Sequence, residues 1–178
     1  MAGNPELASL WPDADVYTAP LGTSLPATVD DDFPAGWDLV GLLDGEEGFA
    51  HSREESVEDL FAWGGVLVRR SRRNFKATVK FVALEDNDVT RELIWPGSSA
   101  TSIVVPTPQR ILIAFEAREG AKVQRLISAY QAEVEVDGDI VDNESALTKY
   151  GLIATIYPDA GQNPPELFVR QFDDGTGS

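Results

Sequence analysis

Residues 75–83 read Phe-Lys-Ala-Thr-Val-Lys-Phe-Val-Ala, and this stretch decides the fold class. All its odd-numbered positions are apolar, whereas three of the four even-numbered ones are Lys or Thr. Side chains of an extended chain point alternately to opposite sides, so a period of two places one side in a core and the other in solvent. The stretch therefore predicts a half-buried β-strand.

Segments of similar character lie on both sides of this strand, separated by Gly, Pro and Asp-Gly breaks. Residues 57–63 could also form a single helical turn, and the first half of 121–136 a helix, but strand is favoured for both. The pattern predicts eight to ten strands in a mainly β, antiparallel sandwich or barrel. Besides 75–83, the expected strands are 37–43, 48–56, 57–63, 66–70, 102–105, 110–117, 121–136, 150–157 and 166–172.

One segment has the features of a helix. Asn87 or Asp88 can cap the first turn of the run 89–95, and early acidic residues suit the N-terminal end of a helix. Pro96 and Gly97 then stop the run. We expect one short α-helix at about residues 87–95, flanking the sheet.

The N-terminal region, residues 1–36, carries a proline every six to eight positions, which blocks helix and favours extended chain. Its large apolar side chains predict an extended arm or cap that docks on its own domain or on a neighbour. The β-domain is expected at 37–172 and a flexible tail at 173–178. The candidate anchors of the arm, open between capping the core and a subunit contact, are Trp11, Tyr17 and Trp37.

The other aromatic residues in periodic apolar segments are expected in the core. They are Trp63, Phe75, Phe81, Trp95 and Phe115.

The net charge of −16 is unevenly distributed along the chain. Residues 30–59 hold eleven acidic residues and one base, Arg53, and residues 133–144 hold six acidic residues and no base. Between them lies a basic block formed by Arg69, Arg70, Arg72, Arg73, Lys76 and Lys80. A solvated face and contacts between copies of the chain both remain open for these charges. The overall acidity argues against tight DNA binding.

Chemistry-bearing motifs are absent. With no cysteine and one histidine, thiolate and imidazole metal sites are not expected. His51 and Ser52 are adjacent on an expected strand, so they point to opposite faces and do not suit catalysis. The acids at 137–144 resemble a calcium loop only faintly. We expect no enzyme activity, no cofactor, no metal, no signal peptide and no membrane span.

Four ordered segments resemble the major tail tube proteins of siphophages, especially those of actinobacteria. They are 15–20 (DVYTAP), 36–45 (GWDLVGLLDG), 58–65 (EDLFAWGG) and the strand-to-helix passage 75–87. Their order and spacing match over residues 14–170.

The resemblance implies a β-sandwich flanked by one helix, in a structural virion protein of the phage tail. Such subunits form hexameric rings that stack into a tube, with the inner sheets joined in a barrel around a lumen for genome ejection. Implied partners are further copies of the chain, the tape measure protein, the tail terminator and baseplate hub proteins. DNA would pass without specific binding, and no membrane is involved. The protein would be located in the virion, and in the host cytoplasm during assembly.

Charge then suggests two residue roles. Acids expected on one side of their strands would line the lumen, namely Glu54, Glu58, Glu133 and Glu135. The basic block 69–80 would make contacts between stacked rings. The alternatives are a related tail terminator or hub subunit and an acidic carbohydrate-binding β-sandwich.

Overall fold

The computed structural model describes residues 8–176, which contain one helix, α1 (Asp88–Ile94), and nine strands. The strands are β1 (Asp13–Pro20), β2 (Asp38–Leu39), β3 (Ala50–Phe61), β4 (Leu67–Ala83), β5 (Arg110–Glu119), β6 (Lys122–Ser128), β7 (Gln131–Val136), β8 (Tyr150–Tyr157) and β9 (Phe168–Asp173). All pair antiparallel, in the order β2-β1-β5-β7-β8-β4-β3, with β6 and β9 branching from β5. The predicted mainly antiparallel β fold with one short helix is confirmed, and the sheet does not close into a barrel.

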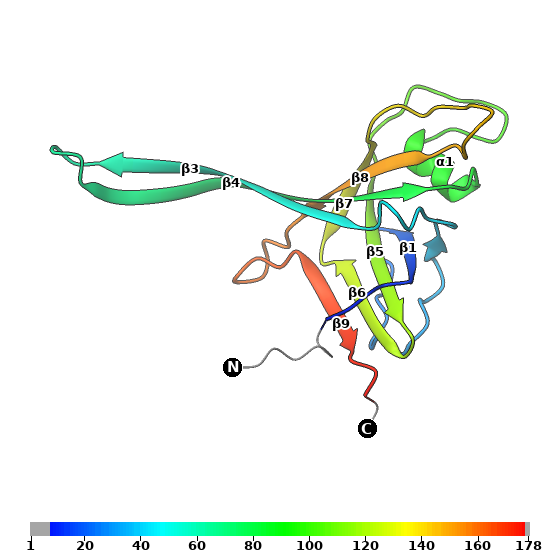
Figure 1. Ribbon diagram of the computed structural model, residues 1–178, viewed down its shortest axis with the longest axis horizontal. Coiled ribbons are helices and arrows are strands. Elements are labelled where there is room, and N and C mark those ends of the chain that lie inside the picture. The colour runs from blue at the N-terminus through cyan, green and yellow to red at the C-terminus, as the bar shows by residue number, and fades with distance from the viewer. Residues whose placement is uncertain (1–7, 177–178) are drawn as a thin grey trace.

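Strand β5 divides the sheet into two layers. Only Arg110 and Ile111 pair with β7, whereas residues from Ala114 onward pair with β6. One layer therefore contains β3, β4, β8 and β7, and the other contains β2, β1, β5, β6 and β9. In Figure 1 the strands of the second layer cross the direction of β3, β4 and β8.

The main core lies between these layers. Phe81 of β4 and Leu152 of β8 meet Val16 of β1 and Phe115 of β5, and all four side chains are fully or almost fully buried. The rings of Phe81 and Phe115 pack edge to face, with centroids 5.8 Å apart. Alternation along 75–83 thus identifies the core side of β4 correctly from Ala77 onward.

Helix α1 begins at the predicted cap. Asn87 accepts a hydrogen bond from the Thr90 backbone N–H through its side-chain oxygen, at 2.9 Å. Its amide nitrogen donates to the Val40 carbonyl at 2.7 Å, and the buried Thr90 hydroxyl donates to the same oxygen. Leu93 and Ile94 are buried against the core. The cap therefore also ties residue 40, just after the N-terminal region, to the helix.

The N-terminal region docks on its own domain. β1 pairs with β5 along all eight of its residues, so residues 13–20 of the expected arm form a strand of the sheet. Trp37 is buried in a second apolar cluster with Leu112 and Ile127. Residues 1–7 of the expected arm, and 177–178 of the expected tail, lie outside the described residues.

Several predicted strands have different limits. The segments 48–56 and 57–63 form the single strand β3, and 66–70 joins 75–83 in β4. Residues 121–136 divide into β6 and β7, 37–43 keeps only the two-residue β2, and 102–105 is not a strand. The β3–β4 pairing continues through a register shift between Glu54 and Ser56, where Asn74 adopts φ 57°.

The joined strands form a long hairpin that extends away from the rest of the molecule (Figure 1). Its far half has no core beneath it. The expected burial of Trp63 and Phe75 is therefore wrong: Trp63 is fully exposed and Phe75 is 48% exposed. Trp95, at the C-terminal cap of α1, is 37% exposed and is also not a core residue. Apolar periodicity shows which side a residue is on, but not whether anything covers that side.

We expect Phe115→Ala to destabilise the fold by about 3–5 kcal/mol, because it opens a cavity between the two layers. Phe75→Ala is the matched control, and its half-exposed ring predicts a loss of about 1 kcal/mol or less. Urea unfolding followed by circular dichroism measures both. Equal losses in the two variants would contradict the assignment of the core.

Candidate assembly surface

The far part of the β3–β4 hairpin is exposed on both faces. The hairpin tip, residues 61–68, joins the two strands and is rich in large apolar side chains. Exposed apolar groups gathered on one projecting element are typical of an interaction surface, and an isolated two-stranded ribbon is only marginally stable in water. The exposed apolar residues of the tip are Phe61, Trp63, Val66, Leu67 and Val68.

Strand pairing determines which side chains share a face, since directly paired residues point to the same side. Ala77 and Val79 are buried, so Lys76 and its partner Glu54 point away from the core. Glu58 lies four residues along β3 from Glu54 and shares its side. The side of β3, β4, β8 and β7 turned away from the core is called the outer face below.

Strand β7 adds two further acids to the outer face. Glu133 is paired with Thr155, which is paired with Thr78 of β4. Likewise, Glu135 is paired with Ile153 of β8, which is paired with Lys80 of β4. The structure therefore brings all four acids proposed for the lumen, Glu54, Glu58, Glu133 and Glu135, onto a single face.

The basic block divides between the two sides of β4. Arg70 and Arg72 lie opposite to the outer face and pair with Asp59 and Glu55 of β3, at 2.7 and 2.9 Å. The hydrogen bond from Arg70 lowers the pKa of Asp59. Two acids of the run 30–59 therefore meet the basic block within one chain.

The remaining four basic residues lie on the outer face with the acids. Lys80 pairs with Asp137, the residue after β7, at 2.6 Å. Arg69 and Arg73 make no ion pair within residues 8–176. Arg110 of β5 also lies there, opposite Glu133. The outer face thus holds five acidic and five basic residues: Glu54, Glu58, Glu133, Glu135 and Asp137, with Arg69, Arg73, Lys76, Lys80 and Arg110.

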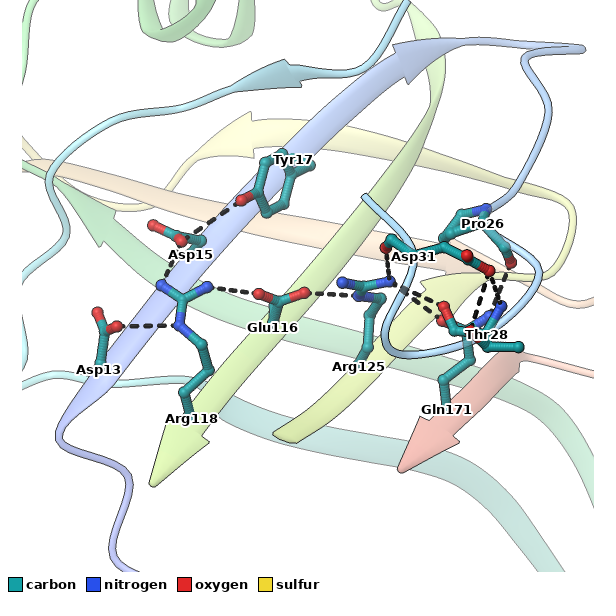
Figure 2. Close-up of polar contacts among 10 residues, drawn as sticks. All are labelled: Asp13, Asp15, Tyr17, Pro26, Thr28, Asp31, Glu116, Arg118, Arg125 and Gln171. Carbon is teal, nitrogen blue, oxygen red and sulfur yellow. Dashed lines mark hydrogen bonds and ion pairs between the residues drawn. The ribbon is translucent and has the colours of Figure 1, made fainter. Parts of the chain in front are cut away.

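A second polar feature, a chain of ion pairs, lies on the other layer, and Figure 2 shows it. Arg118 of β5 donates hydrogen bonds to Asp13, Asp15 and Glu116. Arg125 of β6 donates to the other oxygen of Glu116 at 2.5 Å. Both members of the Glu116–Arg125 pair are buried, so each needs the other to offset the loss of water. Nothing in their local sequence distinguishes these charges from solvated ones.

The ion-pair chain holds the N-terminal region against the sheet. Arg125 donates to the backbone carbonyls of Thr28 and Asp31, and its guanidinium lies 4.4 Å from the Phe33 ring centre. Arg118 binds β1 through Asp13, and that hydrogen bond lowers the pKa of Asp13. Partial burial opposes protonation of Arg118, but its three carboxylate partners raise its pKa overall.

The three proposed arm anchors make contacts inside their own chain. Tyr17 stacks on Phe33 with ring centres 4.1 Å apart, and burial raises the pKa of its hydroxyl. Trp37 is buried and donates from its indole N–H to the Ser24 carbonyl at 2.9 Å. Trp11 lies under the ammonium group of Lys122, 5.8 Å away.

Within residues 8–176, no group of three or more His, Asp or Glu side chains is placed to hold a metal ion. His51 points toward the Phe115 ring, and burial lowers its pKa. Ser52 lies on the other side of β3. No helix in this part of the chain has the length and apolar character needed to cross a membrane.

Comparison with known families agrees with the resemblance of the four ordered segments. The sequence model of the family described as "Phage tail tube protein" matches residues 1–169. The chain belongs to the phage tail tube protein family. A search of curated protein sequences finds no match. Membership supports a structural role in the virion tail for this tail tube protein.

We expect Glu116→Gln to destabilise the tail tube protein by about 3–5 kcal/mol, because it leaves the buried Arg125 without its counter-charge. Asp13→Asn is the matched control: it removes a partner of Arg118 that is 64% exposed, and a loss of about 1 kcal/mol or less is expected. Chemical unfolding at neutral pH measures both. If Glu116→Gln cost no more than the control, the ion-pair chain would not be what holds residues 26–33.

Proposed function

We propose that copies of this chain assemble into rings, hexameric as the family resemblance implies, and that the rings stack into the tail tube through which the genome leaves. The observation that carries the proposal is the β3–β4 hairpin. It extends beyond its own core with both faces and an apolar tip exposed (Figure 1). A neighbouring copy would supply the surface that the single chain lacks.

The layer β3-β4-β8-β7 is suited to form the wall of the lumen. Outside the far half of the hairpin, its core side is covered by the second layer, so its outer face is the one left for an interior channel. It has four antiparallel strands, and an even number keeps the alternation of strand direction when one layer continues into the next copy. Such continuation would also remove the exposed edge of β3.

Charge on the outer face supports passage of DNA without specific binding. These five basic residues are interleaved with five acids, so their charges balance and they offer no continuous basic track to phosphates. Glu54, Glu58, Glu133 and Glu135 remain our candidates for acids lining the lumen.

Within the basic block, Arg69, Arg73 and Lys76 are the members that we propose for contacts between copies, including stacked rings. Arg70, Arg72 and Lys80 already have partners in their own chain.

If the protein forms the tail tube, we expect it to contact other proteins of the tail. The tape measure protein would fill the lumen before ejection, and the tail terminator and baseplate hub proteins would cap the ends. We propose assembly in the host cytoplasm followed by residence in the virion. No catalytic role is proposed.

Electron microscopy of the concentrated protein tests this function, and we expect long tubes. Replacing residues 59–70 with Asn-Gly joins Glu58 to Ser71 by a two-residue turn and removes the tip. This variant should keep its core and thermal stability but form no tubes. Leu147→Ser, which changes an exposed apolar residue away from the hairpin, is the control and should still form them. Isolated rings from the unmodified protein would indicate a terminator instead, and a stable monomer would contradict assembly.

A further inference from the structure

An apolar groove lies between α1 and the end of β7. Its volume is about 510 Å³. Leu93, Ile94 and Trp95 form one wall, the prolines at 106 and 108 form another, and Val134 and Val136 of β7 lie along its border. Trp95 and Val136 are each 37% exposed, so this groove leaves large apolar side chains in contact with water.

The groove runs beside a free strand edge. β7 pairs with β8 along its whole length, but on its other side only Ala132 and Glu133 pair with β5. The backbone of residues 134–136 therefore has no strand partner on that side within the described chain. An unpaired edge beside an apolar groove can accept both a strand and the side chains beneath it.

The β3–β4 hairpin carries a matching surface. Val57, Phe61 and Leu67 lie on the side opposite to its outer face, which continues the core side of the sheet and also carries the Arg70–Asp59 and Arg72–Glu55 ion pairs. All three are half-exposed, because this part of the hairpin extends beyond the core of its own chain. The outer edge of β3 also has no strand partner among residues 8–176.

The two surfaces cannot meet within one chain. The hairpin tip and α1 lie at opposite ends of the longest axis of the molecule (Figure 1). Only a second copy can bring the tip of one chain to the groove of another.

We propose that the core-side face of the hairpin, Val57, Phe61 and Leu67, covers the α1–β7 groove of the next copy, with β3 adding to the free edge of β7. The contact specifies the assembly interface and rests on the proposed function. Within one chain β7 runs parallel to β4, whereas β3 runs antiparallel to β4. The pair formed by β3 of one copy and β7 of the next is therefore antiparallel, like the rest of the sheet.

Charge favours the same arrangement. The segment 133–144 beside the groove holds six acids and no base. The incoming hairpin brings Arg69 and Arg73, which have no ion pair with residues 8–176 of their own chain. Opposite charges on the two surfaces would set the register of the contact and speed its formation. The interface joins different surfaces of identical chains, so it propagates head to tail and can close into a ring.

Cysteine cross-linking tests the contact, since the chain has no cysteine of its own. Leu67→Cys on the core-side face is combined with Val136→Cys at the groove, and the assembled protein is treated with a short bis-maleimide. A ladder of covalent oligomers is expected on denaturing gels. Each single variant should give no ladder beyond a dimer. The matched control combines Val136→Cys with Leu60→Cys, which is on the opposite side of the hairpin, and should give no ladder.

A second variant tests the groove without cross-linking. Val136→Glu places a charge in the apolar contact and should raise the protein concentration needed for tube formation by about tenfold or more. Leu147→Glu, at an exposed site that does not line the groove, should leave it unchanged. Unaltered thermal stability shows that both variants are folded.

The outcomes separate the contact from the function. If tubes form but the Leu67→Cys/Val136→Cys variant gives no ladder, or only the Leu60→Cys/Val136→Cys control gives one, the contact is overturned while the proposed function stands. A ladder from protein that forms no tubes would uphold the contact and overturn the proposed function.

Discussion

The divided pairing of β5 is the constraint on which the rest of the structure depends. Because β5 pairs with β7 through two residues and then with β6, one continuous sheet becomes two layers that face each other. Phe81 and Phe115 can meet only because of this division. It also gives the layer β3-β4-β8-β7 one covered side and one open side. The same division ends β7's pairing with β5 at Glu133, which leaves the last residues of β7 with a free edge.

Local sequence patterns predict what depends on neighbours along the chain. The alternation at 75–83 and the cap at Asn87 gave the right elements because their causes are periodicity and one hydrogen bond. Burial of Trp63 was predicted wrongly, because it lies in the turn after β3, where the hairpin has extended past the end of the core. The Glu116–Arg125 pair had no local signal, since its burial depends on the segment 26–33 folding over it.

The positions of the charged residues show most clearly how strand pairing rearranges what is separate in the sequence. In the sequence the basic block 69–80 is separate from the acids on either side. Pairing of β3 with β4 places Asp59 beside Arg70. On the outer face, β8 lies between the basic residues of β4 and the acids Glu133 and Glu135 of β7. Segregation along the chain thus becomes alternation on a surface. The ten charges counted on the outer face balance, and the excess of sixteen acidic residues lies elsewhere on the chain.

This distribution of charge affects how a chain with unpaired strand edges avoids aggregation before it assembles. The edge of β3 and the apolar tip could pair with any exposed strand, which is the usual route to aggregation. Net negative charge on the rest of the surface makes random encounters between copies repulsive. Arg69 and Arg73 sit on the projecting hairpin, so attraction is strongest where the hairpin of one copy meets an acidic segment of another. An acidic chain with a basic hairpin therefore favours one orientation of approach over the many that would expose the same edges.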